Sequence, residues 1–232
     1  VVLTSGRPLE GMTPYLAELG LTGQDDYVIC YNGALVQQVA DQRILRSQLL
    51  TGSDASAIAH LASELGVNVH GFSVRQGLIS PRVSTYTEHE SRLIKLPINL
   101  VDFATLPADE QIMKVMMIDP EPLLSRAIAQ LPAELHERYT VVRSSPYFLE
   151  FMNKRSNKGT GVAALAEHLD LDASQVIAVG DAGNDRHMIE YAGLGVAMGN
   201  ATDEIKALAQ HTTARNDEDG VARVIEQFIL NA

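Results

Sequence analysis

The chain has 232 residues, of which 46% are hydrophobic, and its formal net charge is −11. This content suffices for a packed core, but no window approaches the roughly 18 uninterrupted apolar residues of a membrane-spanning helix, which excludes a helical membrane protein. The acidic charge argues against nonspecific binding to nucleic acid or anionic lipid, yet it permits an anionic substrate, because a bound divalent cation inverts the local field.

The first part of the chain alternates the patterns of buried strands and an amphipathic helix. Apolar runs followed by turn residues predict strands, and apolar positions at helical spacing predict the helix. The Asn32-Gly33 turn dipeptide closes the second strand, and the two apolar runs behind it indicate a hairpin. The expected order is strand, helix, strand and hairpin, at residues 1–4, 9–19, 27–31 and 35–49.

The middle of the chain, residues 47–153, predicts an α+β module with a mostly antiparallel sheet. Its expected strands lie at residues 67–72, 78–79, 113–118, 139–143 and 147–151. Its expected helices lie at residues 53–65, 86–94 and 122–130, and Ser53 or Asp54 is the expected cap of the first.

After Asn153 the α/β alternation returns. Strands are expected at 176–179, 195–198 and 211–213, between helices at 160–169, 185–192, 202–209 and 220–230. The simplest architecture is a doubly wound parallel core made of two separated pieces, with the middle module inserted as a lid. The expected domains are therefore a core formed by residues 1–46 and 154–232 and an inserted domain formed by residues 47–153.

Two features bear on the origin of the chain and its compartment. Residues 1–4 open in what resembles the middle of a buried strand, without an initiator Met or a leader-like composition, so we expect a fragment. The single cysteine, Cys30, lies in an apolar strand-like run and is expected to be a buried packing thiol. One cysteine permits no internal disulfide, which indicates a reducing, cytoplasmic compartment.

The most informative stretch is the loop that follows the strand at residues 176–179. Gly180 ends the apolar run, and Asp181, Asn184 and Asp185 follow within five residues. Hard oxygen ligands at the carboxyl end of a buried strand suit Mg²⁺, which prefers one or two carboxylates plus waters and a substrate phosphate. The alternative is that Asn184 or Asp185 caps the next helix and Asp181 is an ordinary loop acid.

Three further loops follow expected core elements. Ser5-Gly6-Arg7 offers a hydroxyl and backbone N–H groups that could hold a phosphate oxygen, although Ser-Gly is also a common turn. Asn32-Gly33 offers a side-chain amide, but alone it fits a plain turn. Lys158 stands at the start of a helix, where its charge opposes the helix dipole unless it serves an anion; otherwise it is an exposed lysine.

Together the four loops resemble the haloacid dehalogenase superfamily of phosphohydrolases, in particular its Cof-type sugar-phosphatase subgroup. The resemblance covers essentially the whole chain. It rests on the segments Leu3-Thr4-Ser5-Gly6-Arg7-Pro8, Tyr31-Asn32-Gly33-Ala34, Ser145-Pro146-Tyr147-Phe148-Leu149-Glu150, Asn157-Lys158-Gly159 and Gly180-Asp181-Ala182-Gly183-Asn184-Asp185.

The resemblance implies an α/β core with an inserted α/β cap, a Mg²⁺ cofactor and a role for each matching position. Ser5 and Lys158 match catalytic positions: the hydroxyl bonds the transferring phosphoryl group, and the ammonium neutralises its charge. The metal-binding positions it implies are Asp181, Asn184 and Asp185. The phosphate-binding positions it implies are Ser5, Gly6, Arg7, Asn32, Gly33, Lys158 and Asn184.

The sequence departs from the family pattern at the nucleophile. The resemblance implies a nucleophilic aspartate, and an acid/base aspartate two residues later, on a central strand that precedes the Ser5 motif. That piece would comprise roughly 30–40 residues and would lie between the strands of residues 1–4 and 176–179. None of the loop acids Asp25, Asp26, Asp41 and Asp54 can replace it, so we expect no phosphatase turnover from these 232 residues.

The sequence therefore predicts an Mg²⁺-dependent phosphatase of small phosphorylated metabolites, such as sugar phosphates, acting through an aspartyl-phosphate. Two alternatives stay open: a non-catalytic remnant that binds phosphometabolites or a partner, and, less favoured by the inserted module, a phosphomutase. The expected partner is a small phosphorylated metabolite rather than nucleic acid or membrane, and a homo-oligomer is left open.

Overall fold

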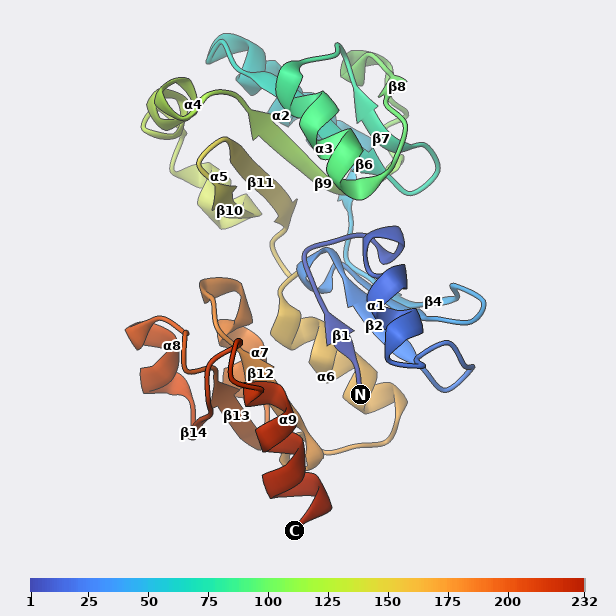
Figure 1. Ribbon diagram of the computed structural model, residues 1–232. Coiled ribbons are helices and arrows are strands. Elements are labelled where there is room, and N and C mark those ends of the chain that lie inside the picture. The colour runs from blue at the N-terminus through green and yellow to red at the C-terminus, as the bar shows by residue number, and fades with distance from the viewer. Residues whose placement is uncertain (232) are drawn as a thin grey trace. The chain divides into compact units, whose positions relative to one another are not determined.

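The computed structural model describes residues 1–231, and the chain forms two compact units (Figure 1). The α/β unit contains Val1–Ser5, Gly23–Arg46 and the described residues from Asn157 onward, and the antiparallel unit contains Gly6–Thr22 and Ser47–Ser156. Compared with the division expected from the sequence, residues 6–22 and 154–156 group with the inserted module.

The α/β unit contains two sheets. In the first, β1 (Leu3–Thr4) is parallel to β2 (Tyr27–Cys30), and the order continues to β3 (Leu35–Gln38) and β4 (Ile44–Ser47). In the second, β12 (Ile177–Gly180), β13 (Leu194–Ala197) and β14 (His211–Thr212) are parallel. The α/β class is confirmed, but a single core sheet is not formed, because within residues 1–231 β1 pairs only with β2 and β12 only with β13.

Helix α6 (Lys158–His168) joins these two sheets. Its Val162 packs against the hydrophobic cluster that contains Tyr27 and Ile29 of β2, and also against the cluster that contains Ala178 of β12. Burying apolar surface on both sides contributes about 25 cal/mol per Å², so α6 helps to hold the two sheets of this unit together. The remaining helices of this unit are α7 (Arg186–Tyr191), α8 (Asp203–Leu208) and α9 (Gly220–Ile225), which continues as a π turn over Glu226–Leu230.

The antiparallel unit is built on a sheet in the order β10-β11-β9-β6-β7-β8, with β5 pairing β9. Its strands are β5 (Leu50–Thr51), β6 (Asn68–Ser73), β7 (Gly77–Ser80), β8 (Asn99–Leu100), β9 (Gln111–Ile118), β10 (Tyr139–Ser145) and β11 (Phe148–Asn153). Its helices are α1 (Thr13–Glu18), α2 (Gly52–Glu64), α3 (Thr85–Ile94), α4 (Glu121–Ile128) and α5 (Glu134–Arg138).

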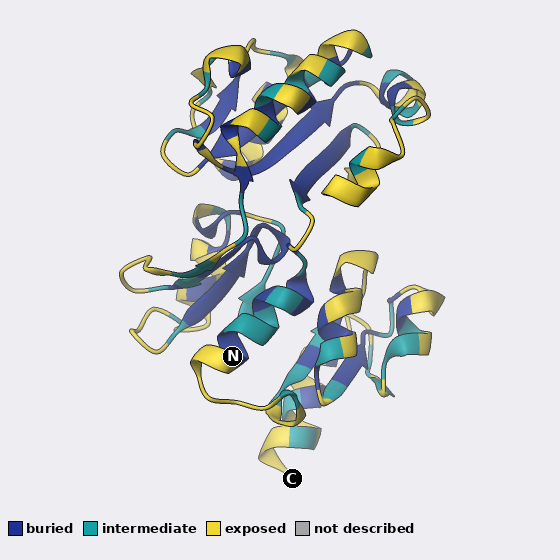
Figure 2. Ribbon diagram, turned by 180° about the vertical axis from the view of Figure 1, so that it is seen from behind, coloured by how far each residue is buried: buried dark blue, intermediate teal, exposed yellow. Residues whose placement is uncertain are grey.

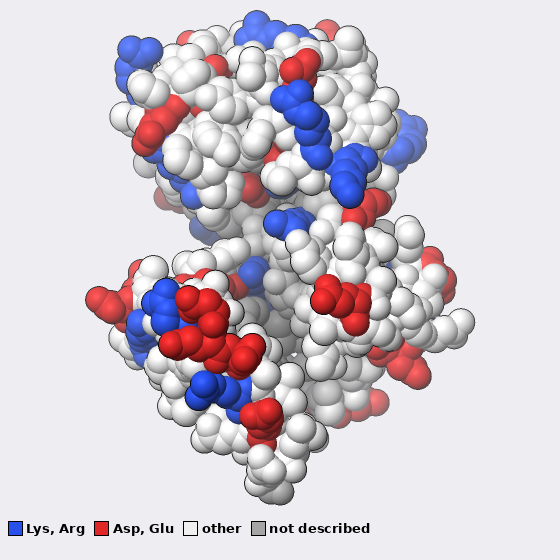
Figure 3. Space-filling model, viewed as in Figure 1, with Lys and Arg blue, Asp and Glu red and all other residues white. Residues whose placement is uncertain are grey.

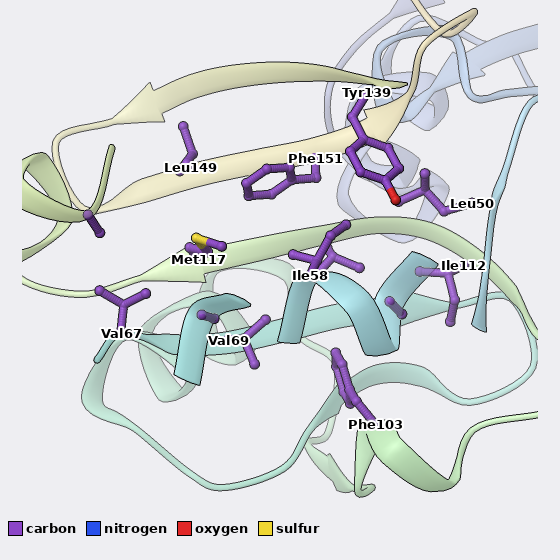
Figure 4. Packing of buried hydrophobic residues seen from close by; sticks show 14 of the residues in the cluster. Leu50, Ile58, Val67, Val69, Phe103, Ile112, Met117, Tyr139, Leu149 and Phe151 are labelled. Carbon is purple, nitrogen blue, oxygen red and sulfur yellow. The ribbon is translucent and has the colours of Figure 1, made fainter. Parts of the chain in front are cut away.

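The core of the antiparallel unit lies between one face of this sheet and α2 (Figure 4). Ile58 of α2 packs with Met117 of β9 and Phe151 of β11, all with at most 1% of their surface exposed. Strands β9 and β11 are buried along almost their whole length (Figure 2). Because neighbouring residues of a strand point to opposite faces, the second face is covered as well, and it carries the buried polar side chains of Lys114 and Glu150.

Most elements lie within two residues of their expected positions, but several differ, and the short strands β5 and β8 were not expected. The cap of α2 is Thr51, whose hydroxyl accepts a hydrogen bond from the Asp54 backbone, rather than Ser53 or Asp54. The helix expected at 9–19 divides into a 3-10 turn at Leu9–Gly11 and α1, and α5 was not expected. The thiol of Cys30 is buried, as predicted. Among the residues described, no helix combines the length and apolar character needed to cross a bilayer.

Candidate active site

The buried ion pair between Lys158 and Asp185 lies at the centre of the candidate site. Asn157 caps α6 by accepting a hydrogen bond from the Thr160 backbone at 2.9 Å, which makes Lys158 the first residue of the helix. The Lys158 Nζ lies 2.5 Å from the Asp185 Oδ1, and both side chains are less than 10% exposed. A lysine at a helix N-terminus is disfavoured by the dipole, and in the structure the Asp185 carboxylate offsets that cost.

Asp185 also shapes the loop that follows β12. Its Oδ2 accepts hydrogen bonds from the backbone N–H groups of Asp181, at 2.9 Å, and Ala182, at 3.0 Å. Both carboxylate oxygens therefore have partners within the protein, and the negative charge is balanced by Lys158 and two backbone dipoles. In this geometry Asp185 fixes the loop and the lysine.

Asp181 differs from Asp185 because its side chain is exposed. Its Oδ2 accepts a hydrogen bond from Asn200 Nδ2 at 2.9 Å. Its other oxygen, Oδ1, has no hydrogen bond or ion pair to any residue that the structure describes. Of the two loop carboxylates, Asp181 is thus the one with an oxygen available to a ligand.

A left-handed turn at Tyr31–Gly33 brings the first sheet to this loop. Its three residues have φ values of 50°, 54° and 92°, a conformation that costs non-glycine residues roughly 1–2 kcal/mol each. The turn allows the Asn32 backbone N–H to donate to the Ser5 carbonyl at 2.9 Å. It also allows the Asn32 Oδ1 to accept from Asn184 Nδ2 at 3.0 Å.

Two glycines permit the close packing around the start of α6. A Cβ on Gly33 would lie 2.0 Å from the backbone oxygen of Asn157, and a Cβ on Gly159 would lie 2.4 Å from that of His187. Real Cβ atoms do not approach backbone oxygens so closely, so both positions require glycine. They let the left-handed turn and α7 contact the end of α6 that carries Lys158.

A continuous set of contacts thus links the four loops singled out in the sequence. It runs from the Ser5 backbone through Asn32 and Asn184 to the loop of Asp185, and from there to Lys158. Arg7 and Gly6 belong to the antiparallel unit, where the exposed Arg7 guanidinium carbon lies 5.9 Å from the centre of the Tyr15 ring.

The charges beside the loop are balanced on the outer surface. Arg186 follows Asp185, but its guanidinium pairs with Glu190 and Glu204, each at 3.0 Å. Figure 3 shows basic and acidic side chains next to one another over α7 and α8. The cation that pairs with a loop carboxylate is therefore Lys158 rather than the neighbouring arginine.

The oxygen atoms of the loop after β12 fit a hard cation whose other ligands are waters and a substrate phosphate. Within residues 1–231 no three His, Cys, Asp or Glu side chains gather as a metal cage. Mg²⁺ needs no such cage, because it keeps several waters and is bound by one or two carboxylates together with a substrate phosphate. The Asp181 Oδ1 meets that requirement as a single direct ligand, and Lys158 supplies a positive charge within the same contact network.

The sequence interpretation missed two parts of this region. Asn200, which donates to Asp181, ends the Met198-Gly199-Asn200 turn after β13, the same strand-then-polar pattern that singled out the loop after β12. The chain also carries an acidic Asp-Glu-Asp-Gly sequence at 217–220. Its Asp217 pairs with Arg215 at 3.2 Å in an exposed turn before α9, so it does not end a buried strand.

Comparison with known proteins identifies the family of the chain. Residues 1–225 match the family model of haloacid dehalogenase-like hydrolases. The chain is 39% identical to "Putative phosphatase YxeH" of Bacillus subtilis, over 99% of this chain and 86% of the relative. It is 38% identical to "Putative phosphatase M6_Spy0533" of Streptococcus pyogenes, over 100% of this chain and 86% of the relative.

A solved structure gives the same picture at the level of the fold. The crystal structure of a haloacid dehalogenase-like hydrolase from Bacteroides thetaiotaomicron matches with a TM-score of 0.83 and 29% sequence identity. The match covers 97% of this chain and 85% of that protein.

Proposed function

Because this chain belongs to the haloacid dehalogenase-like hydrolases, we propose that its site binds Mg²⁺ and the phosphate group of small phosphorylated metabolites, and that the reaction it serves is phosphate monoester hydrolysis. The observation that carries the proposal is the contact network that runs from Ser5 to the Asp185 loop and Lys158. It offers a hydroxyl, an ammonium and an available carboxylate oxygen in one connected set.

Each residue has a defined task in this proposal. Lys158 neutralises charge on the phosphoryl oxygens, and Asp185 holds the ammonium in place while it bonds to two backbone N–H groups of the loop. Ser5 donates its hydroxyl to a phosphoryl oxygen. Asn32 and Asn184, joined through their amides, would line the phosphate site, and their hydrogen bond keeps the two loops in register. Fixed donors aimed at developing charge are the usual source of stabilisation in phosphoryl transfer.

Asp181 would hold Mg²⁺ through Oδ1, and Asn184 and Asp185 would orient the surrounding waters. When bound, the ion neutralises phosphate charge and stabilises the in-line displacement. Asp181 keeps Oδ1 directed to a ligand because its Oδ2 is already engaged by Asn200.

The nucleophile is the part of the reaction that these residues do not supply. Hydrolysis through an aspartyl-phosphate needs a carboxylate that attacks phosphorus in line and a second acid that protonates the leaving oxygen. We propose that the 232 residues alone bind the ligands without turnover. The alternative of a purely binding protein has the same basis, and only phosphate release separates the two.

The proposed substrate class is a small phosphorylated metabolite such as a sugar phosphate, in the cytoplasm. A lysine, a hydroxyl and a carboxylate that can hold Mg²⁺ are the kinds of group that bind a single phosphate monoester. The motifs shared with Cof-type sugar phosphatases support the same class.

The proposal is tested first by binding. Calorimetric titration of the 232-residue chain with Mg²⁺, and then with a sugar monophosphate in the presence of Mg²⁺, is expected to show saturable binding of both. Asp181→Asn should remove the Mg²⁺ signal, and Lys158→Met should weaken the phosphate ester. Exposed Asp203→Asn is the matched control and should change neither. Unchanged Mg²⁺ binding in Asp181→Asn would show that the metal assignment is wrong.

Turnover is tested separately. Phosphate release is measured for the mass-verified 232-residue chain and for the product of the complete gene, with Mg²⁺ and with EDTA. Release is expected only from a product that also carries the nucleophilic carboxylate. Mg²⁺-dependent release by the 232-residue chain would refute our account of its missing nucleophile.

A further inference from the structure

We infer that Asn200 is a positioning residue for the metal carboxylate: it holds Asp181 so that Oδ1, and not Oδ2, faces the cation. This inference rests on the proposed function of Asp181 and adds a residue that the sequence motifs do not assign. It is based on a line of contacts that joins the carboxyl ends of β12, β13 and β14, the three strands of the second sheet.

The first step is the register of β12 and β13. Gly180 pairs with Ala197, so the two parallel strands end at the same level. Asp181 is the first residue beyond β12, and Asn200 is the third beyond β13. The Met198 backbone N–H donates to the Gly180 carbonyl at 2.9 Å, which continues the strand pairing into both loops. The two side chains are therefore brought together by the sheet itself.

The second step is that the amide of Asn200 uses both of its ends. Its Nδ2 donates to the Asp181 Oδ2 at 2.9 Å, and its Oδ1 accepts from the Asn216 backbone N–H at 2.9 Å. A side-chain amide anchored at its oxygen has little freedom to rotate, so its N–H group points in a fixed direction.

The third step is the rigidity of the anchor. Asn216 lies in the loop after β14, and that loop packs against the turn containing Asn200. The Gly199 backbone N–H donates to the Ala214 carbonyl at 3.0 Å, and the Thr213 N–H donates to the Ala197 carbonyl at 2.9 Å. The position of Asn200 is thus set by backbone contacts on both sides, which do not depend on its own side chain.

These contacts leave one Asp181 oxygen for a ligand. Oδ2 is occupied by Asn200, and Oδ1 has no partner among the residues that the structure describes. Groups that orient a metal ligand from behind typically change metal affinity 10–100-fold when they are removed. Asn200 stands in that relation to Asp181.

The test compares Mg²⁺ affinity, measured by calorimetry with Mg²⁺ alone, in variants of the 232-residue chain. Asn200→Ala is expected to weaken Mg²⁺ binding about tenfold. Asn216→Ala is the matched control: its anchoring N–H belongs to the backbone and its side chain is exposed, so its affinity should stay within about twofold of the wild type, well below a 10-fold effect.

A second variant separates positioning from a merely structural role. Asn200→Asp keeps an oxygen that can accept from Asn216 but replaces the donor with a carboxylate beside Asp181. The like charges should lower the melting temperature without metal, and added Mg²⁺ should raise it more than in the wild type. If added Mg²⁺ raises the melting temperature of Asn200→Asp no more than that of the wild type, the residue at position 200 does not act on the metal carboxylate, and the inference is overturned.

The outcomes separate this inference from the proposed function. If Asp181→Asn abolishes Mg²⁺ binding while Asn200→Ala binds like the wild type, the inference is overturned and the metal site stands. If the wild type does not bind Mg²⁺, or Asp181→Asn binds it unchanged, the proposed metal site and the inference both fail.

Discussion

Lys158 Nζ lies 2.5 Å from Asp185 Oδ1, and the two side chains are 9% and 5% exposed. The pair joins the first residue of α6 to the loop that follows the next strand of the chain, β12. A buried ion pair of this kind is costly to desolvate, and it persists here because the second Asp185 oxygen is also fully hydrogen-bonded. The charge that would meet a phosphate is therefore already held in place.

Removal of the ammonium should cost stability as well as phosphate binding. Lys158→Met leaves the buried Asp185 carboxylate without its cation, and we expect a loss of about 3–5 kcal/mol in the free energy of unfolding. The double variant Lys158→Met, Asp185→Asn should recover part of the loss, since no unpaired charge remains. Urea unfolding followed by circular dichroism measures both, and equal stability of Lys158→Met and the wild type would contradict the pairing.

Gly33→Ala should damage the left-handed turn that positions Asn32. Its Cβ would lie 2.0 Å from the Asn157 backbone oxygen, and its φ is +92°. We expect a loss of about 3 kcal/mol or more, since backbone must move as well as a side chain. Gly20→Ala is the matched control: Gly20 also has a positive φ, of +70°, but has no atom within 4 Å of the added carbon, so about 1 kcal/mol is expected. Similar losses for both variants, measured by urea unfolding, would show that the close approach is unimportant.

The sequence predicted most of the helices and strands and the loops of the candidate site, because these depend on local residue patterns. The apolar runs before Gly180 and Cys30 predicted strands β12 and β2, and polar residues at their carboxyl ends indicated the ligand loops. The hydrogen bond between Asn32 and Asn184 spans 152 positions and carries no local signal, so only the fold reveals it.

The roles within the acidic loop were harder to predict. Asp181 and Asp185 are the same residue type in the same loop, so the sequence does not distinguish their roles. In the structure Asp185 is buried and faces Lys158, whereas Asp181 faces solvent.

The helix cap of α2 was missed for a related reason. Thr51 and Asp54 cap it reciprocally, and spacing alone does not distinguish the first hydroxyl of such a box from the residues that follow it. The strand patterns do not specify pairing partners, but the division of the core into two sheets agrees with the resemblance, which implies a further strand between residues 1–4 and 176–179.

His70 should make the antiparallel unit sensitive to mild acid. Burial and, to a smaller extent, the nearby Lys114 ammonium together lower the pKa of His70 to about 3. The unfolded chain takes up a proton below pH 6.5 while the folded chain does not, so the stability is complete above pH 6.5 and falls as the pH drops from 6.5 toward 3. At pH 5 the difference of 6.5 − 5 pH units corresponds to about 2 kcal/mol.

His70→Leu should remove that slope. Its free energy of unfolding, measured in urea between pH 7.5 and 4.5, is expected to vary less with pH than that of the wild type. His60→Leu is the control, because the His60 side chain is 78% exposed, and it should keep the wild-type slope. Parallel pH profiles of His70→Leu and the wild type would show that His70 is protonated in the folded state.

Glu90→Gln should stabilise the protein at neutral pH, in contrast to most changes at buried positions. Burial raises the pKa of Glu90; the Lys114 ammonium opposes that shift, and the Glu150 carboxylate adds to it. Lys114 already pairs with Glu150 at 3.4 Å, so one ammonium serves two buried carboxylates. The folded state holds the Glu90 proton more tightly than the unfolded chain, so stability falls as the pH rises above 4.5.

The neutral amide of Glu90→Gln removes this cost of burying a charge. The melting temperature at pH 7 should therefore rise by a few degrees, with little change near pH 4. Glu88→Gln, on the same helix but with a side chain 52% exposed, should have no such effect. A lower melting temperature for Glu90→Gln at pH 7 would mean that Lys114 depends on both carboxylates, and that the second charge is part of what holds α3 against the sheet.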